Sequence, residues 1–144
     1  MFLGQYSYTL DGKGRVTIPA AFRKALEGEK VVVTRGLDRC LTVYPISVWQ
    51  EIAAKVNALP ITDPKGRALR RLLFADAVDA ALDRQGRLLL PERLRAYAGL
   101  ERDVVVVGLD HFIELWHPQR WAEENARQMA LMEEDPSLWE NLQI

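Results

Sequence analysis

The sequence has a single cysteine, Cys40, among its 144 residues, which excludes an internal disulfide and argues against a cysteine-based zinc site. No apolar run approaches the roughly 18 residues that a membrane-spanning helix needs. The first residues, from Met1 to Gln5, lack the charged and apolar segments of a signal peptide. Apolar residues make up 49% and charged residues 27%, as in globular domains, so a disordered or coiled-coil chain is disfavoured. We expect a soluble cytoplasmic protein with no membrane partner.

The motifs that carry enzyme chemistry are also missing. There is no Walker-type or dinucleotide-binding glycine pattern, and Ser7, Ser47 and Ser137 have no nucleophile-elbow context. His111 and His117 are single residues without metal-ligand spacing. We therefore expect no catalytic residue, no metal, no cofactor and no small-molecule substrate, and predict that the protein is not an enzyme.

Charge is unevenly distributed along the chain. The formal net charge is only −1, which taken alone argues against a nucleic-acid partner. Residues 1–100, however, contain 16 basic and 10 acidic side chains, whereas residues 101–144 contain 3 basic and 10 acidic ones. The first part could approach phosphate while the acidic end stays away from it, although ordinary solvated charge would explain the same counts.

The most informative feature is an internal repeat with an offset of 72 residues. Residues 10–19, LDGKGRVTIP, align with residues 82–91, LDRQGRLLLP, and the register continues without a gap. Thirteen of the 40 positions from 10 to 49 are identical in the two copies, and they include Arg23 with Arg95 and Trp49 with Trp121. The chain is therefore two copies of one unit, and two copies are too few for a solenoid.

The residue pattern predicts the same elements in each copy. Alternating apolar residues indicate strands over 6–10 and 78–82 and after each Asp-x-x-Gly-Arg motif, and apolar runs indicate further strands over 31–34, 41–44, 104–107 and 112–116. The residues between each Asp and Arg suit a hairpin loop. Short helices are expected after Pro19 and Pro91, and longer ones near 46–58, 65–75 and 119–133.

One copy is too small to bury an adequate core alone. The two copies should therefore pack on each other as a mixed α/β, β-rich body with a pseudo-twofold axis. We predict a first repeat over 5–47, a helical connector over 48–75, a second repeat over 76–119 and an acidic C-terminal helix and tail over 120–144.

The two motif loops are the candidate functional site. Strand alternation places Asp11 and Arg15 on the outer face, opposite each other across the loop, and the same holds for Asp83 and Arg87. A surface ion pair with an aspartate capping loop amides is the simplest interpretation of each pair. Recurrence of the arginine in both copies favours contact with an anion, because its planar fork matches a phosphate or a guanine edge.

Each loop tip has a further cation. Lys13 lies in the first loop and Arg84 in the second, so each loop has a net charge of +1 after its aspartate is counted. Gly14 and Gly86 complete the turns. Two more groups are expected to be structural: Arg67, Arg70 and Arg71 as a solvated helix face, and Trp49, Trp116, Trp121 and Trp139 as core or interface anchors.

These residues resemble the bacterial MraZ family. The matching segments are the opening MFLGQY, the two ten-residue motifs and the middle segment RRLLFA over 70–75, and the resemblance extends to about residue 135. It implies two SpoVT-AbrB-type repeats that form a pseudo-dimeric double-split β barrel with flanking helices. It also implies that Asp11 to Arg15 and Asp83 to Arg87 contact DNA, with Lys13 and Arg84 adding cations.

The function implied is that of a transcriptional regulator. MraZ proteins are similar to sequence-specific DNA-binding regulators, here expected to be a repressor, of the division and cell-wall gene cluster. They bind tandem repeats of double-stranded DNA in their own promoter, associate with the nucleoid and form homo-oligomeric rings. Gln85 stands where the first loop has Lys13, so the two loops need not contribute equally.

Two alternatives stay open from the residues alone. One is an antitoxin-like AbrB relative whose acidic C-terminal segment wraps a toxin, although the fused double repeat argues against it. The other is a protein-interaction module without nucleic acid, which suits a pI near 6.1. The acidic segment beyond Pro136 is expected to be dispensable for DNA binding.

Overall fold

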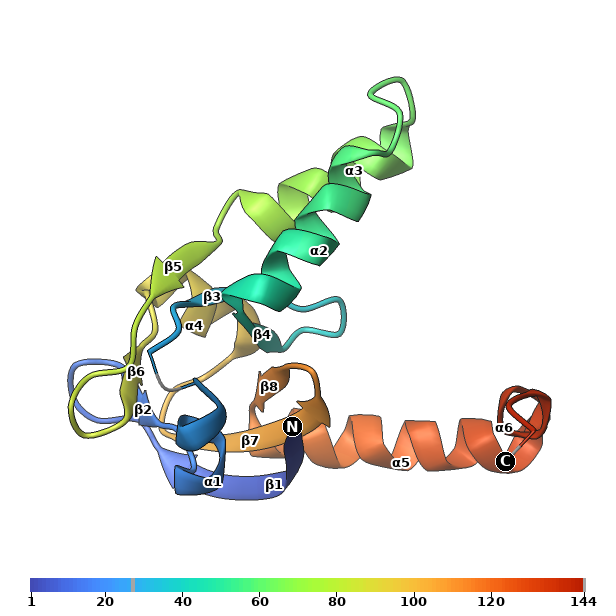
Figure 1. Cartoon of the computed structure of the whole chain (residues 1–144). Coiled ribbons are helices and arrows are strands. Elements are labelled where there is room, and N and C mark those ends of the chain that lie inside the picture. The colour runs from blue at the N-terminus through green and yellow to red at the C-terminus, as the bar shows by residue number, and fades with distance from the viewer. Residues whose placement is uncertain (27, 144) are drawn as a thin grey trace.

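A computed structural model describes residues 1–26 and 28–143 of the chain. The strands are β1 Phe2–Thr9, β2 Arg15–Thr17, β3 Val31–Arg35, β4 Leu41–Pro45, β5 Val78–Ala80, β6 Arg87–Leu89, β7 Asp103–Asp110 and β8 Ile113–Trp116. The helices are α1 Ala20–Arg23 with the 3-10 turn Lys24–Leu26, α2 Ile46–Asn57, α3 Pro64–Phe74, α4 Glu92–Ala98, α5 Pro118–Glu134 and α6 Ser137–Asn141. The predicted mixed α/β, β-rich fold of two repeats is confirmed (Figure 1).

The strand order reflects the internal repeat. The large antiparallel sheet runs β1-β7-β8-β4-β3-β5, and a second sheet contains only β2 and β6. When each strand of the second copy is replaced by its counterpart in the first, the six-stranded order reads the same in both directions. Val16 pairs with Leu88 and Thr42 with Glu114, and both pairs join residues 72 positions apart. The pseudo-twofold axis therefore passes between β2 and β6 and between β4 and β8.

The predicted hairpins are wrong. β1 pairs along its whole length with β7, and β5 pairs with β3, so neither strand pairs with the one that follows its motif loop. The strands after the loops, β2 and β6, pair with each other instead. Each copy thus exchanges strands with the other, because one copy alone cannot cover its own apolar residues.

The main core lies between the two sheets and the short helices. Val16, Ile18 and Phe22 of the first copy and their counterparts Leu88, Leu90 and Leu94 are all fully buried in one cluster. A smaller cluster on the outer face of the large sheet joins Cys40, Val105, Val107 and Trp116, with Trp121 of α5 packed against it.

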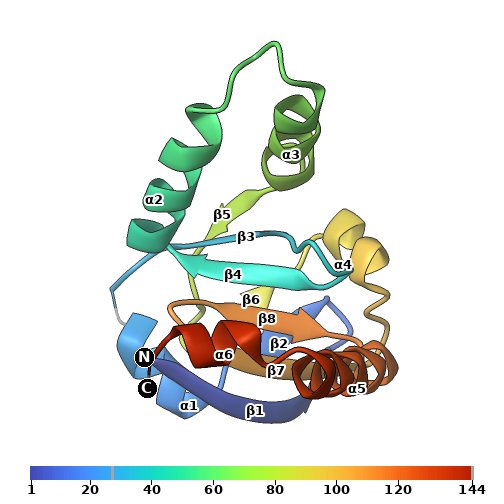
Figure 2. The ribbon, with the colours of Figure 1, turned by 90° about the vertical axis from the view of Figure 1, so that its right-hand side faces the viewer.

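Two helical parts leave this body separately. α2 and α3 project together as an antiparallel pair, whereas α5 leaves the sheet as a separate arm with α6 at its end (Figures 1 and 2). The two motif loops lie on the opposite side of the body from this arm (Figure 1). In the described part of the chain, no helix is long and apolar enough to cross a membrane.

Candidate nucleic-acid interface

Asp11 organises the first motif loop. Its Oδ1 accepts hydrogen bonds from the backbone amides of Lys13 and Arg15, both at 2.9 Å, and its Oδ2 accepts one from Arg15 Nε at 2.6 Å. The backbone closes the turn through Gly14 N donating to Asp11 O at 3.1 Å. The amide of Arg15, followed by its side chain, lowers the pKa of Asp11 from 3.8 to about 2, although partial burial opposes the shift. Asp11 therefore stays ionised and caps the loop as predicted.

The second loop repeats this arrangement. Asp83 Oδ1 accepts from the amides of Gln85 and Arg87 at 2.9 Å, and Oδ2 accepts from Arg87 Nε at 2.8 Å. The amide of Arg87 is again the main reason that the pKa of Asp83 is lowered. The equal geometry of the two loops, which differ at their two tip residues, shows that the shared Asp, Gly and Arg set the loop conformation.

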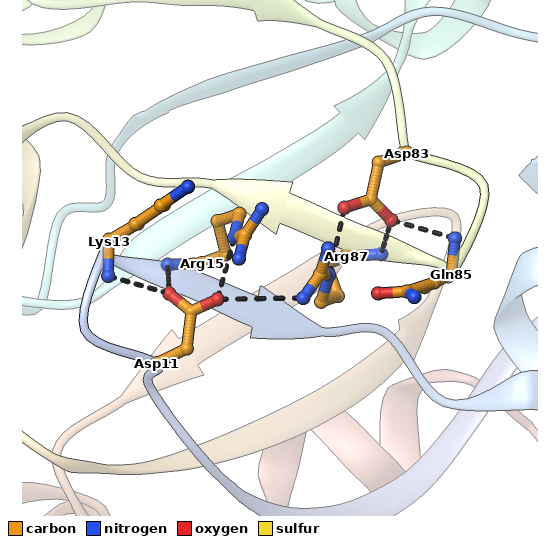
Figure 3. A network of polar contacts seen from close by, with 6 residues as sticks. All are labelled: Asp11, Lys13, Arg15, Asp83, Gln85 and Arg87. Carbon is orange, nitrogen blue, oxygen red and sulfur yellow. Dashed lines mark hydrogen bonds and ion pairs between the residues drawn. The ribbon is translucent and has the colours of Figure 1, made fainter.

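The two loops form one continuous site. Pairing of β2 with β6 brings Arg87 to the first loop, where its Nη1 lies 3.7 Å from Asp11 Oδ2. Figure 3 shows the resulting row of Asp11, Arg15, Arg87 and Asp83 along the two-stranded ribbon. The two predicted pairs are thus brought together across the pseudo-twofold axis.

The arginines are less exposed than the sequence suggests. The side chains of Arg15 and Arg87 are 27% and 28% exposed, because each lies along the ribbon against an aspartate. Since a carboxylate holds Nε, the terminal Nη groups are aimed in a fixed direction. Lys13 and Arg84 are exposed at the tips, and neither forms an ion pair with the described residues.

Arg23 and Arg95 are parts of the site that the motif alone does not indicate. Arg23 Nε donates to Ile18 O at 2.8 Å, and its side chain crosses Gly86 in the loop of the other copy. Arg95 Nε donates to Leu90 O at 2.9 Å and crosses Gly14 in the same way. Their identity at corresponding repeat positions was the available signal, but only the strand exchange places each beneath the opposite loop.

The two glycines at these crossings have conformations that other residues rarely adopt. Gly14 has φ +79° and Gly86 has φ +74°. A Cβ on Gly14 would lie 2.9 Å from Arg95 Nε, and one on Gly86 would lie 2.5 Å from Arg23 Nε. Glycine is therefore needed here both for the turn and for the close approach of the arginine.

The second loop borders a cationic cavity. The cavity has a volume of about 390 Å³, and its lining includes Arg23, Lys30 and Arg84 as well as the acidic residues Glu29 and Asp83. Arg84 aligns with Gly12 and Gln85 aligns with Lys13, so the tip cation lies one position earlier in the second loop than in the first.

The remaining candidates have structural surroundings. Arg67 and Arg70 donate to backbone carbonyls at the end of α2 and in the following turn, so they are less solvated than predicted. Cys40 is fully buried, and its burial raises the pKa of the thiol. No cluster of three or more metal-ligating side chains is present within residues 1–26 and 28–143. Of the tryptophans predicted to be core or interface anchors, Trp116 is buried in the core. Trp139 is 61% exposed, so for it the interface role stays a prediction.

Fold and site together define a class: a pseudo-dimeric, double-split β barrel of two repeats that carries one Asp-x-x-x-Arg loop per repeat on a shared ribbon. The model of a protein family described as "MraZ protein, putative antitoxin-like" matches residues 1–72 and again residues 73–138. The chain belongs to the MraZ family.

Several curated relatives support this assignment. The "Transcriptional regulator MraZ" of Thermomicrobium roseum is 51% identical over 142 residues, which are 99% of this chain and 97% of the relative. That of Herpetosiphon aurantiacus is 55% identical over 121 residues, 84% of each chain. That of Halothermothrix orenii is 45% identical over 141 residues, 94% of this chain and 98% of the relative.

Proposed function

We propose that this protein is a transcriptional regulator that binds double-stranded DNA through its two motif loops. The observation that carries the proposal is the row of Asp11, Arg15, Arg87 and Asp83 on one two-stranded ribbon (Figure 3). A two-stranded ribbon fits the major groove, where arginine can hold the O6 and N7 atoms of guanine. The names of the curated relatives support the regulatory role.

In this proposal Arg15 and Arg87 read the DNA, while Lys13 and Arg84 contact phosphates beside them. Asp11 and Asp83 hold the arginines in place, and Gly14 and Gly86 allow the turns. The cavity beside Arg84 brings Arg23 and Lys30 to the second loop, where they would add phosphate contact.

The wider biological role follows from the family. We propose repression of the division and cell-wall gene cluster through tandem repeats in the protein's own promoter, on the nucleoid, by a homo-oligomer that forms a ring. Residues 5–47 and 76–119 would be the two DNA-binding repeats, 48–75 their connector and 120–144 a part that does not contact DNA. None of these roles requires a cofactor or a catalytic step.

The experiment is a binding titration by fluorescence anisotropy on the DNA upstream of the gene, repeated over a range of salt concentrations. Specific binding should exceed binding to a scrambled probe, and the logarithm of the binding constant should fall linearly with the logarithm of salt concentration. Equal affinity for the two probes would contradict the proposal of sequence-specific DNA binding. Absence of any salt-dependent binding would instead favour the antitoxin-like or protein-interaction alternative.

A further inference from the structure

The C-terminal arm, defined as α5 and α6 (residues 118–143), presents apolar side chains that no other part of residues 1–26 and 28–143 covers. Trp121 near its start packs against Trp116, but no residue of α5 or α6 is buried. The large apolar side chains exposed along it are Met129, Leu131, Met132, Leu138, Trp139 and Leu142. An exposed apolar group of this size on a folded helix is typical of a protein–protein contact.

A second surface has the opposite charge to the C-terminal arm. The α2–α3 groove is defined by Asn57, Ile61, Arg67, Arg70 and Arg71 and has a volume of about 460 Å³. Ile61 at its rim is 76% exposed. Arg67 and Arg70 donate to backbone carbonyls between residues 57 and 61, so their guanidinium groups are held in position along the groove.

Charge distinguishes this groove from other possible contacts of the arm. Residues 118–143 contain six acidic and two basic side chains, whereas residues 55–71 contain five basic side chains and one acidic side chain. Pairing of an arm with another arm would bring like charges together, and pairing of arm with groove brings opposite charges together. The outer end of the arm stands well apart from the groove of its own chain (Figure 1). The partner must then be a second chain.

We propose that the C-terminal arm of one copy docks in the α2–α3 groove of a second copy, with Trp139 as its anchor. A tryptophan ring can stack on the arginines that line the groove, and both residue types are common where binding energy is concentrated. Each copy offers one arm and one groove, so the contact is head-to-tail and adds copies until a ring closes. This inference rests on the homo-oligomer of the proposed function but not on DNA binding.

Residues 136–143 form the outer end of the C-terminal arm. Removal of residues 136–144 deletes Trp139, and we now expect it to abolish assembly while leaving the contact of a single chain with DNA intact. The charge pattern alone indicated only that this segment avoids phosphate.

The first test measures mass by sedimentation without DNA. Trp139→Ala and Arg71→Glu alter exposed side chains that form no hydrogen bond or ion pair within residues 1–26 and 28–143. Each variant should reduce the wild-type assembly to the single chain of 16.4 kDa. Leu37→Ala and Lys24→Glu are matched controls, because both side chains are exposed outside the arm and the groove. These controls should keep the wild-type mass. Wild-type mass in folded Trp139→Ala or Arg71→Glu, or a wild-type protein that is itself a single chain, would overturn the proposal.

The second test identifies which surfaces meet. When the Trp139→Ala and Arg71→Glu proteins are mixed, the intact arm of the second can still dock in the intact groove of the first, so the mass should double and rise no further. Oxidation of a Trp139→Cys chain mixed with an Ile61→Cys chain should give a disulfide-linked heterodimer, whereas the native Cys40 is buried and should not react. A mixture that stays at single-chain mass, or linkage only between two Trp139→Cys chains, would contradict arm-to-groove docking. The Trp139→Ala and Arg71→Glu proteins should still bind a one-repeat DNA probe as single chains. Loss of that binding would count against the DNA-binding proposal, not against arm-to-groove docking.

Discussion

At the scale of single residues, the aspartates turn two flexible side chains into oriented donors. A free arginine loses about 1.5–2 kcal/mol of side-chain entropy when it is fixed in one geometry. Here Asp11 and Asp83 fix the Nε ends of Arg15 and Arg87 before any ligand arrives. The aspartates bring negative charge toward DNA, so their benefit must come from this orientation rather than from net charge.

Replacement of the motif arginines tests their role in binding. Arg15→Ala and Arg87→Ala should each weaken specific DNA binding by about 1–3 kcal/mol, or roughly 5- to 150-fold. Each side chain makes only surface ion pairs, which contribute little to the free energy of unfolding. The thermal midpoint should therefore change by only a few degrees. Arg93→Ala is the control, since its side chain is 85% exposed and lies outside the loops. Anisotropy titrations that give wild-type affinity for the double variant would remove the loops from the mechanism.

The pKa of Asp11 reports its contact with Arg15. Its pKa in the folded state, about 2, lies below the ordinary 3.8, so its contribution to stability is present above pH 4 and is lost as the pH falls from 4 through 2. Carbon-13 NMR of the side-chain carboxyl should show this low pKa, and Arg15→Ala should move it upward.

The matching substitution is Asp11→Asn, tested at neutral pH. It removes a negative charge near the proposed phosphate contact, yet it should weaken DNA binding because Arg15 loses its ionic partner. Tighter binding by Asp11→Asn would mean that charge, not orientation, dominates.

At the scale of elements, the internal repeat predicts most of the helices and strands, but not which strands pair with each other. Alternation and the capping prolines indicated the strands and helices of each copy, including α2, α3 and α5 within one or two residues. Local pattern carries no information on which chain segment a strand edge meets. The turn residues therefore predict β1 beside β2, whereas β1 pairs with β7. The same exchange hid Arg23 and Arg95, which act on the loop of the other copy.

Glycine substitutions test this exchanged packing. Gly86→Ala and Gly14→Ala should each destabilise the fold by about 1–3 kcal/mol, because a left-handed backbone disfavours alanine and the new Cβ meets an arginine. The effect should be larger at Gly86, where the approach is closer. Gly12→Ala in the same loop is the control, since a Cβ there meets nothing within 4 Å. Urea unfolding that ranks Gly12→Ala as the most damaging would show that the crossings are not packed as described.

At the scale of the whole molecule, the two proposed activities are kept apart in space. The motif loops and the C-terminal arm lie on opposite sides of the body (Figure 1). The loops lie within residues 1–100, where basic side chains outnumber acidic ones, and the arm lies within residues 101–144, where acidic side chains predominate. This separation lets an acidic arm hold copies together without bringing its charge to the DNA.

Binding by the assembled molecule should depend on the number of DNA repeats. The two loops of one chain have four basic side chains of their own, Lys13, Arg15, Arg84 and Arg87. One chain alone should therefore bind weakly and with strong salt dependence. When copies are joined through arm and groove, contacts to neighbouring repeats become intramolecular, which can raise affinity by roughly 10²–10⁴-fold. Titration of probes with one, two and three repeats should show this steep rise for the wild type and its loss for Arg71→Glu, with equal affinity of both proteins for the single repeat. If Arg71→Glu gains as much affinity from added repeats as the wild type does, the loops act independently and assembly has no part in recognition.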